Sequence, residues 1–250
     1  MFEGKLASLG GVMAAALLGV AAPAVAAPML QNILPFGDNR GAPTPPVARY
    51  LANQGQSFIF DRESAPQALL KFDDNPEVWA LEAVTAPRGD TVYRNDAGEI
   101  VLRLTRLGGL TLFTEQEPGG LPVAMLSEAD NLLPPPGMPQ SAVFQRIIQA
   151  GLRASRAVQH PITFDAPGYP SQAGPLVVDT AIVAADALVR MSRRPDCHAF
   201  LMRLDKLTIV MGAKADVAVN GQVMTITVAP GKGFAGRPSS DRLIKAALRR

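Results

Sequence analysis

The residue types best suited to ligand binding are concentrated near the C-terminal end, in the segment PGKGFAGRPSS at 230–240. Glycines let backbone N–H groups approach a ligand closely, and a helix that starts beside them adds unpaired N–H donors and a positive dipole end. The spacing therefore predicts an anion-binding loop, with the following candidate residues: Lys232, Gly233, Gly236, Arg237, Ser239 and Ser240. The alternative is a glycine-bearing connection that leads into an N-capped helix.

This segment differs from the common phosphate-binding and nucleophile motifs. It does not fit a Walker A loop, because Lys232 precedes the last glycine and Arg237-Pro238 stand where Lys-Ser/Thr is required. Ser239 and Ser240 are candidate nucleophiles of a hydrolase, but neither lies in a G-x-S-x-G motif. No catalytic residue is predicted, so enzymatic activity stays open and is the less expected outcome.

Two carboxylates form a second candidate site. Asp179 and Asp186 are seven positions apart, and therefore share one face of a predicted helix over 174–193 that is apolar nearly all round. Such a pair could supply the acid and base of a hydrolase. The structural interpretation, which we favour, is that they pair with Arg146 and Arg153 on the preceding helix, because an unpaired buried charge is very costly.

Neither a metal nor a cofactor is predicted. The run Asp73-Asp74-Asn75-Pro76 lacks the glycine and the distal glutamate of an EF-hand loop, and is typical of an Asx-type turn. The formal net charge of +2 is too small to indicate nucleic acid as a partner. Cys197 is the only cysteine, so the fold does not depend on an internal disulfide, and we interpret it as a structural thiol.

The N-terminal residues predict export. Lys5 precedes an apolar run over 9–25, and Ala24-Val25-Ala26 is an A-x-A motif of the kind that signal peptidase cleaves. No later stretch has about 18 uninterrupted apolar residues, so no transmembrane segment is expected after cleavage. We therefore expect residues 1–26 to be a signal peptide and the mature protein to be periplasmic or secreted.

The clearest secondary structure lies at 88–114, where turn residues and strand periodicity agree. Strands are predicted at 91–94, 99–105 and 110–114, with turns at Asn95-Asp96-Ala97-Gly98 and Gly108-Gly109. Further strands are expected at 58–60, 68–72, 77–82, 199–211, 216–219 and 222–228, the last two joined by Asn220-Gly221. An edge strand is expected at 122–126. Helices are expected at 141–159, 174–193 and 241–250, with one helical turn at 47–53.

Together these elements predict an α+β fold: a largely antiparallel β-sheet of meanders and hairpins, two central helices and a short C-terminal helix. Prolines at 134–139 mark the internal boundary. We divide the chain into a signal peptide at 1–26, a Pro-rich linker or strap at 27–56, a β-meander half at 57–133 and an α+β half at 134–250. The two halves are expected to pack as one domain.

Three stretches carry a family resemblance: LLKFDDNPEVWAL at 69–81, RGDTVYRNDAGEIVLRLTRLGGLTLFT at 88–114 and GFAGRPSSDRL at 233–243. In these the chain resembles an uncharacterised family of exported proteins from Gram-negative bacteria, catalogued as a domain of unknown function. The resemblance implies an exported domain and carries no activity or catalytic residues.

We therefore expect an exported binding or envelope-associated protein. Its ligand is unknown; an anionic small molecule or an envelope protein is the expected partner. Two alternatives stay open. A hydrolase would bring a nucleophile and a base together in one pocket, and a protein–protein interaction scaffold would expose a large apolar patch.

Overall fold

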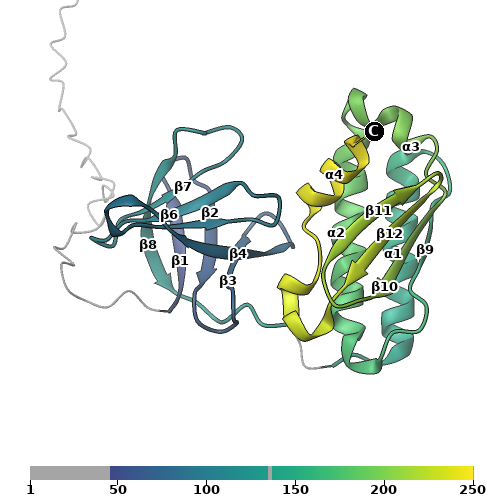
Figure 1. Ribbon diagram of the computed structural model, residues 1–250, viewed down its shortest axis with the longest axis horizontal. Coiled ribbons are helices and arrows are strands. Elements are labelled where there is room, and N and C mark those ends of the chain that lie inside the picture. Colours follow the sequence, from purple (N-terminus) through teal and green to yellow (C-terminus); the bar gives the residue numbers. More distant parts are fainter. Residues whose placement is uncertain (1–45, 135–136, 250) are drawn as a thin grey trace, which may run out of the picture. The chain divides into compact units, whose positions relative to one another are not determined.

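The computed structural model describes residues 46–134 and 137–249, all within one compact unit (Figure 1). The predicted signal peptide and residues 27–45 of the predicted linker lie outside these ranges. The described chain forms a β-barrel over residues 47–128, followed by a four-stranded sheet with its helices over residues 140–248. The fold is α+β, as the sequence predicted.

The barrel is an up-and-down arrangement in which each strand pairs antiparallel with the next and the last strand pairs with the first. This closure leaves no unpaired edge. The strands are β1 Val47–Ala52, β2 Ser57–Asp61, β3 Ala68–Phe72, β4 Val78–Thr85, β5 Thr91–Arg94, β6 Ile100–Leu104, β7 Leu110–Leu112 and β8 Leu121–Glu128.

Aromatic side chains fill the barrel interior. Phe58 and Phe60 are completely buried on β2, with Ile59 between them pointing outward, as the two-residue period of a strand requires. The rings of Phe60 and Tyr93 meet edge to face with centroids 4.9 Å apart. The interior of an eight-stranded barrel is just wide enough for side chains such as these to fill it.

The predicted meander at 88–114 is confirmed as β5, β6 and β7. Leu102 pairs with Leu112, and both are fully buried. Asn95 shapes the β5–β6 turn, because its side-chain oxygen accepts hydrogen bonds from the backbone of Ala97 and Glu99. Gly98 completes this turn at a φ of 85°, which favours glycine.

Two predictions in the barrel are corrected. The helical turn expected at 47–53 is strand β1, so part of the predicted linker belongs to the barrel; its buried positions Ala48, Tyr50 and Ala52 alternate as in a strand. The strand expected at 122–126 is not an edge strand but part of β8, which pairs on both sides. Both errors arise because the β1–β8 pairing joins segments about 75 positions apart, which no local pattern reports.

The second part contains α1 Gln140–Val158, β9 Thr163–Asp165, α2 Gly174–Ser192, α3 His198–Leu201, β10 Lys206–Met211, β11 Asp216–Asn220, β12 Val223–Val228 and α4 Ser240–Leu248. Short 3-10 segments lie at η1 Pro87–Gly89, η2 Ser171–Ala173, η3 Pro195–Cys197 and η4 Pro230–Gly236. The hairpin predicted across Asn220-Gly221 is confirmed as β11–β12.

The second sheet is mixed rather than antiparallel. Its order is β11-β12-β10-β9, and β10 runs parallel to both β12 and β9. A parallel pair needs a long crossover, and α2 with α3 supplies it between β9 and β10. The strand expected at 199–211 therefore begins only at Lys206, because residues up to Leu201 form α3.

The helices α1 and α2 lie side by side on the four-stranded sheet and share one hydrophobic core with it (Figure 1). Val177, Ala181 and Ala184 of α2 are completely buried. Among the described residues, α2 with the preceding η2 is the one helix that is long and apolar enough to span a membrane. However, 67% of its most apolar window is buried within the protein, which is typical of a core helix.

Candidate functional site

Arg237, a candidate anion ligand, is buried within the protein and bound to the chain's own carboxylates. Its side chain forms ion pairs with Asp179 of α2 and with Glu77, which precedes β4; the Nη1–Oε1 distance to Glu77 is 3.4 Å. Its Nη2 also donates to the backbone oxygen of Val78 at 2.9 Å. Arg237 is 4% exposed and Glu77 is 2% exposed. The guanidinium therefore links the barrel to α2 through the interior.

The start of α4 binds internal anions. Ser240 donates to Glu77 from its backbone N at 2.9 Å and from its Oγ at 2.6 Å. Ser239, the N-cap of α4, donates from its backbone N and its hydroxyl to Asp96 in the β5–β6 turn, and accepts from the backbone N of Arg242. A helix N-terminus favours such carboxylates. These contacts engage the backbone and hydroxyl donors of both serines with carboxylates of the chain itself.

The other candidates in the 230–240 segment are placed differently. Lys232 is exposed, and Gly233 adopts a φ of 53°. Gly236 is required by packing, since a Cβ there would lie 2.0 Å from the backbone oxygen of Ala229. The backbone of Ala229 donates to the oxygen of Gly236 at 2.7 Å. Glycine at position 236 is therefore explained by the close approach of its backbone to that of Ala229.

Glu77, Arg237 and Asp179 form one cluster of charges. Burial has the largest single effect on the pKa values of Glu77 and Arg237. Burial raises the pKa of Glu77, while the nearby charge of Arg237 and the hydrogen bonds from Ser240 oppose that shift. The charges of Asp179 and Glu77 keep the pKa of Arg237 raised although burial alone would lower it. The cluster is a mutually compensated set of buried charges.

The two aspartates of α2 have different partners. Asp186 pairs with Arg153 of α1 at 2.5 Å, as the seven-residue spacing suggested. Asp179 pairs with Arg237 instead of Arg146 or Arg153, because the C-terminal segment returns to α2. The second oxygen of Asp186, Oδ2, is buried and has no hydrogen-bond partner in the described part of the chain. Burial raises the pKa of Asp186, and Arg153 opposes this.

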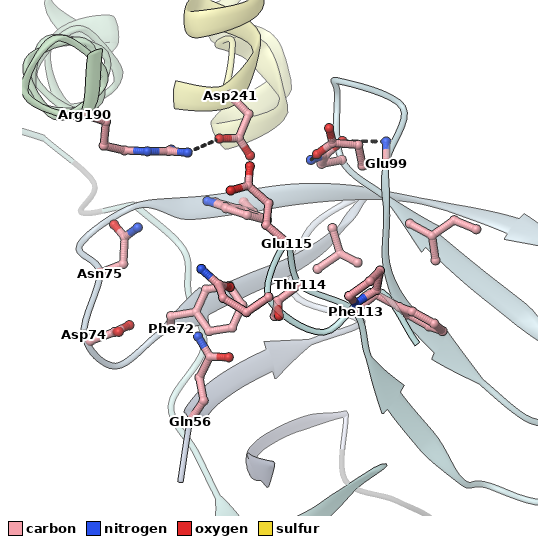
Figure 2. Close-up of a pocket in the computed structure, with 16 residues that line it drawn as sticks. Gln56, Phe72, Asp74, Asn75, Glu99, Phe113, Thr114, Glu115, Arg190 and Asp241 are labelled. Atoms are coloured by element: carbon pink, nitrogen blue, oxygen red, sulfur yellow. Dashed lines mark hydrogen bonds and ion pairs between the residues drawn. The ribbon is translucent and has the colours of Figure 1, made fainter. Parts of the chain in front are cut away.

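A separate cavity lies at one end of the barrel. The β1–β2, β3–β4, β5–β6 and β7–β8 connections meet there and, with side chains from α2 and α4, enclose about 700 Å³ (Figure 2). Its lining consists of Gln56, Phe72, Asp74, Asn75, Trp79, Asn95, Glu99, Ile100, Val101, Phe113, Thr114, Glu115, Gln116, Pro118, Arg190 and Asp241.

The cavity combines aromatic and acidic side chains. The rings of Phe72 and Trp79 meet edge to face at 5.6 Å, and Phe113 contributes a third ring. The indole Nε1 of Trp79 is buried without a hydrogen-bond partner among residues 46–134 and 137–249. Arg190 binds Asp241 at 2.7 Å at the edge of the cavity.

None of the cavity residues was predicted as a site. Asp74 and Asn75 were predicted only as part of a turn. The others lie in strands and turns of the barrel, except Arg190 in α2 and Asp241 in α4, and belong to no binding motif. The cavity arises because barrel closure gathers four connections that are separated by about 20 residues each. Barrel closure was not visible in the sequence, so no local signal could have located it.

The structure also places apolar side chains on the exposed face of α1. Phe144, Ile148 and Leu152, spaced four apart, are 64%, 43% and 52% exposed. These side chains are the observation in favour of the interaction-scaffold alternative, which stays a prediction.

The fold and the cavity define an α+β protein in which a closed up-and-down barrel precedes a mixed sheet. Residues 29–247 match the family described as Domain of unknown function (DUF4908), and the chain belongs to that family. Searches of curated proteins and of solved structures gave no match.

Proposed function

We propose that this protein is an exported, non-catalytic binding protein that holds a small molecule at the mouth of its barrel. The observation that carries this proposal is the cavity of about 700 Å³. Sites for small molecules typically enclose roughly 300–1,000 Å³ and combine apolar walls with a few polar groups. Phe72, Trp79 and Phe113 supply the walls, and amide and carboxylate side chains supply the polar groups.

The contacts of the candidate catalytic residues favour binding over hydrolysis. Asp179 and Asp186 each pair with an arginine, and the hydroxyls of Ser239 and Ser240 donate to carboxylates. The described lining of the cavity contains no histidine, cysteine, serine or lysine.

Export rests on the sequence of residues 1–26, with its apolar run and A-x-A end. Expression of the full chain in a Gram-negative host, followed by N-terminal sequencing of the periplasmic fraction, tests it. The expected product begins at Ala27. A cytoplasmic product that begins at Met1 would contradict export without bearing on the cavity.

The cavity can be tested with an intrinsic probe, because Trp79 is the only tryptophan in the sequence and lines it. Titration with N-phenyl-1-naphthylamine, a neutral aromatic dye, should produce energy transfer from Trp79 and a saturable rise in dye emission. Phe113→Arg should abolish the signal by filling the cavity with a long charged side chain.

The matched control is Leu107→Arg, which introduces the same side chain in the β6–β7 connection, where Leu107 is 96% exposed. This variant should bind the dye like the parent chain. If both variants retain equal binding while folded, the dye binds elsewhere and the cavity loses its support as the ligand site.

A further inference from the structure

We propose that the molecule bound at the barrel mouth carries a positive charge on an aromatic or apolar body, as an organic ammonium or guanidinium compound does. This inference rests on the proposed function and specifies the class of ligand. The 230–240 segment was expected to bind an anion, whereas the ligand proposed for the barrel mouth is a cation. The difference arises because different residues form this cavity.

The lining of the cavity carries an excess of negative charge. It contains Asp74, Glu99, Glu115 and Asp241 against the single cation Arg190. Glu99 is compensated by Lys245 at 2.7 Å, and Asp241 by Arg190 at 2.7 Å. Neither Asp74 nor Glu115 forms a hydrogen bond or ion pair with the described residues. Two carboxylates therefore line the cavity without a bonded cation from the described part of the chain.

The nearby cations are engaged elsewhere. Arg190 binds Asp241 through Nη2 and donates from Nη1 to the Ser240 hydroxyl at 2.8 Å. Arg194 lies within electrostatic reach of Glu115, but its guanidinium binds Asp196 at 2.7 and 3.1 Å. Both guanidinium groups thus have carboxylate partners of their own.

Figure 2 shows the Glu115 side chain extending toward the carboxylate of Asp241, with Arg190 on the other side of Asp241. Two carboxylates that approach each other repel, and a cation placed beside them relieves this repulsion. The position next to Glu115 is therefore electrostatically suited to a positively charged group of the ligand.

The aromatic residues favour the same class of ligand. The faces of Phe72, Trp79 and Phe113 carry the negative part of the ring quadrupole, which attracts ammonium and guanidinium groups. The same rings provide apolar contact for the body of the ligand. An anion would meet unfavourable interactions with both the carboxylates and the ring faces.

The experiment compares three small aromatic probes by calorimetry and by Trp79 fluorescence: benzyltrimethylammonium, benzyl alcohol and phenylacetate. The parent chain should bind the cation most tightly and phenylacetate most weakly, and added salt should weaken cation binding. The double variant Asp74→Asn/Glu115→Gln should lower the affinity for the cation by roughly two- to 25-fold, since each exposed charge contributes up to about fivefold.

The matched control is Glu82→Gln, which removes an exposed carboxylate of β4 that does not line the cavity. It should bind all three probes like the parent chain, and thermal unfolding should show every variant to be folded. If the double variant binds the cation as the parent does, or benzyl alcohol binds as tightly as the cation, the charge inference is overturned.

The neutral dye and the cationic probe test separate claims: the dye tests whether the cavity binds small molecules, and the cation tests whether it selects positive charge. If N-phenyl-1-naphthylamine binds at the cavity and benzyltrimethylammonium does not, the cavity binds small molecules but does not select cations. If neither the dye nor any of the three probes binds, the proposed function itself fails.

Discussion

Arg237 and Glu77 are 160 positions apart in the sequence, yet Nη1 of Arg237 lies 3.4 Å from Oε1 of Glu77 in the protein interior. Glu77 belongs to the β3–β4 connection of the barrel, and Arg237 to the segment that leads into α4. Asp179 of α2 completes the cluster. The C-terminal segment therefore joins the barrel to the second part of the protein through buried charges.

Arg237→Ala should strongly destabilise the protein. The substitution leaves Glu77 and Asp179 without their cation, and removal of one partner from a buried ion pair costs about 3–5 kcal/mol of unfolding free energy. Urea denaturation measures this loss. Lys232→Ala in the same segment is the control, because Lys232 is exposed, and it should change stability by less than about 0.5 kcal/mol. Equal stability of the two variants would show that the cluster is unimportant for folding.

Ser239→Ala should lower the unfolding free energy by about 1 kcal/mol, because Ser239 caps α4 and also donates its hydroxyl to Asp96. Ser192→Ala removes an exposed hydroxyl that donates to the backbone oxygen of Val189 one turn earlier, and serves as the comparison. Thermal unfolding of both variants distinguishes the two sites. A Ser239 variant no less stable than the Ser192 variant would contradict a capping role.

Gly236→Ala should cost about 1–3 kcal/mol, since a new Cβ would meet the backbone oxygen of Ala229 at 2.0 Å and the chain must shift to admit it. Gly231→Ala, five residues earlier, has open space around the new Cβ and should be nearly neutral. Chemical denaturation of both variants tests the difference. If the two substitutions cost the same, the close approach of Gly236 to Ala229 is not what requires glycine.

Asp186 should make stability depend on pH. Burial raises its pKa in the folded state above that in the unfolded state, so the folded state binds the proton more tightly. The stabilising effect of that proton is complete below the unfolded pKa and is lost as the pH rises through the folded pKa.

Asp186→Asn removes this titration. The variant should therefore gain stability relative to the parent chain as the pH rises from about 3 to 7, across the range in which carboxyl groups titrate. Urea denaturation at several pH values measures the difference. A variant that becomes relatively less stable as the pH rises would mean that the Arg153 ion pair outweighs burial.

Several elements were predictable because their causes are local. Asn95 and Gly98 define the β5–β6 turn by their own side chain and backbone, and Asn220-Gly221 does the same for β11–β12. The helical spacing of apolar residues predicted α1, and a segment that is apolar nearly all round predicted α2, each to within about a residue of its ends. The start of the C-terminal helix was also predictable, since α4 begins at Ser240, one residue before the predicted start at 241.

Barrel closure and the mixed sheet required the tertiary structure. The pairing of β1 with β8, and of β10 with β9 and β12, joins segments whose strand patterns are equally compatible with other neighbours. Strand periodicity indicates which residues of a strand share a face, but it does not indicate which other strand pairs with it. The cavity depends on the same barrel closure, so its position could not be predicted from the sequence either.

The amino-acid sequence by itself determined that the 230–240 segment would offer N–H donors and cations suited to an anion, because donor chemistry follows from residue type and from the start of a helix. Only the tertiary structure decided that Glu77 and Asp96 are the anions bound there. The physical reason is that the contact depends on how the barrel turns and α4 come together, and Coulomb attraction acts on distance in space whatever the separation along the chain.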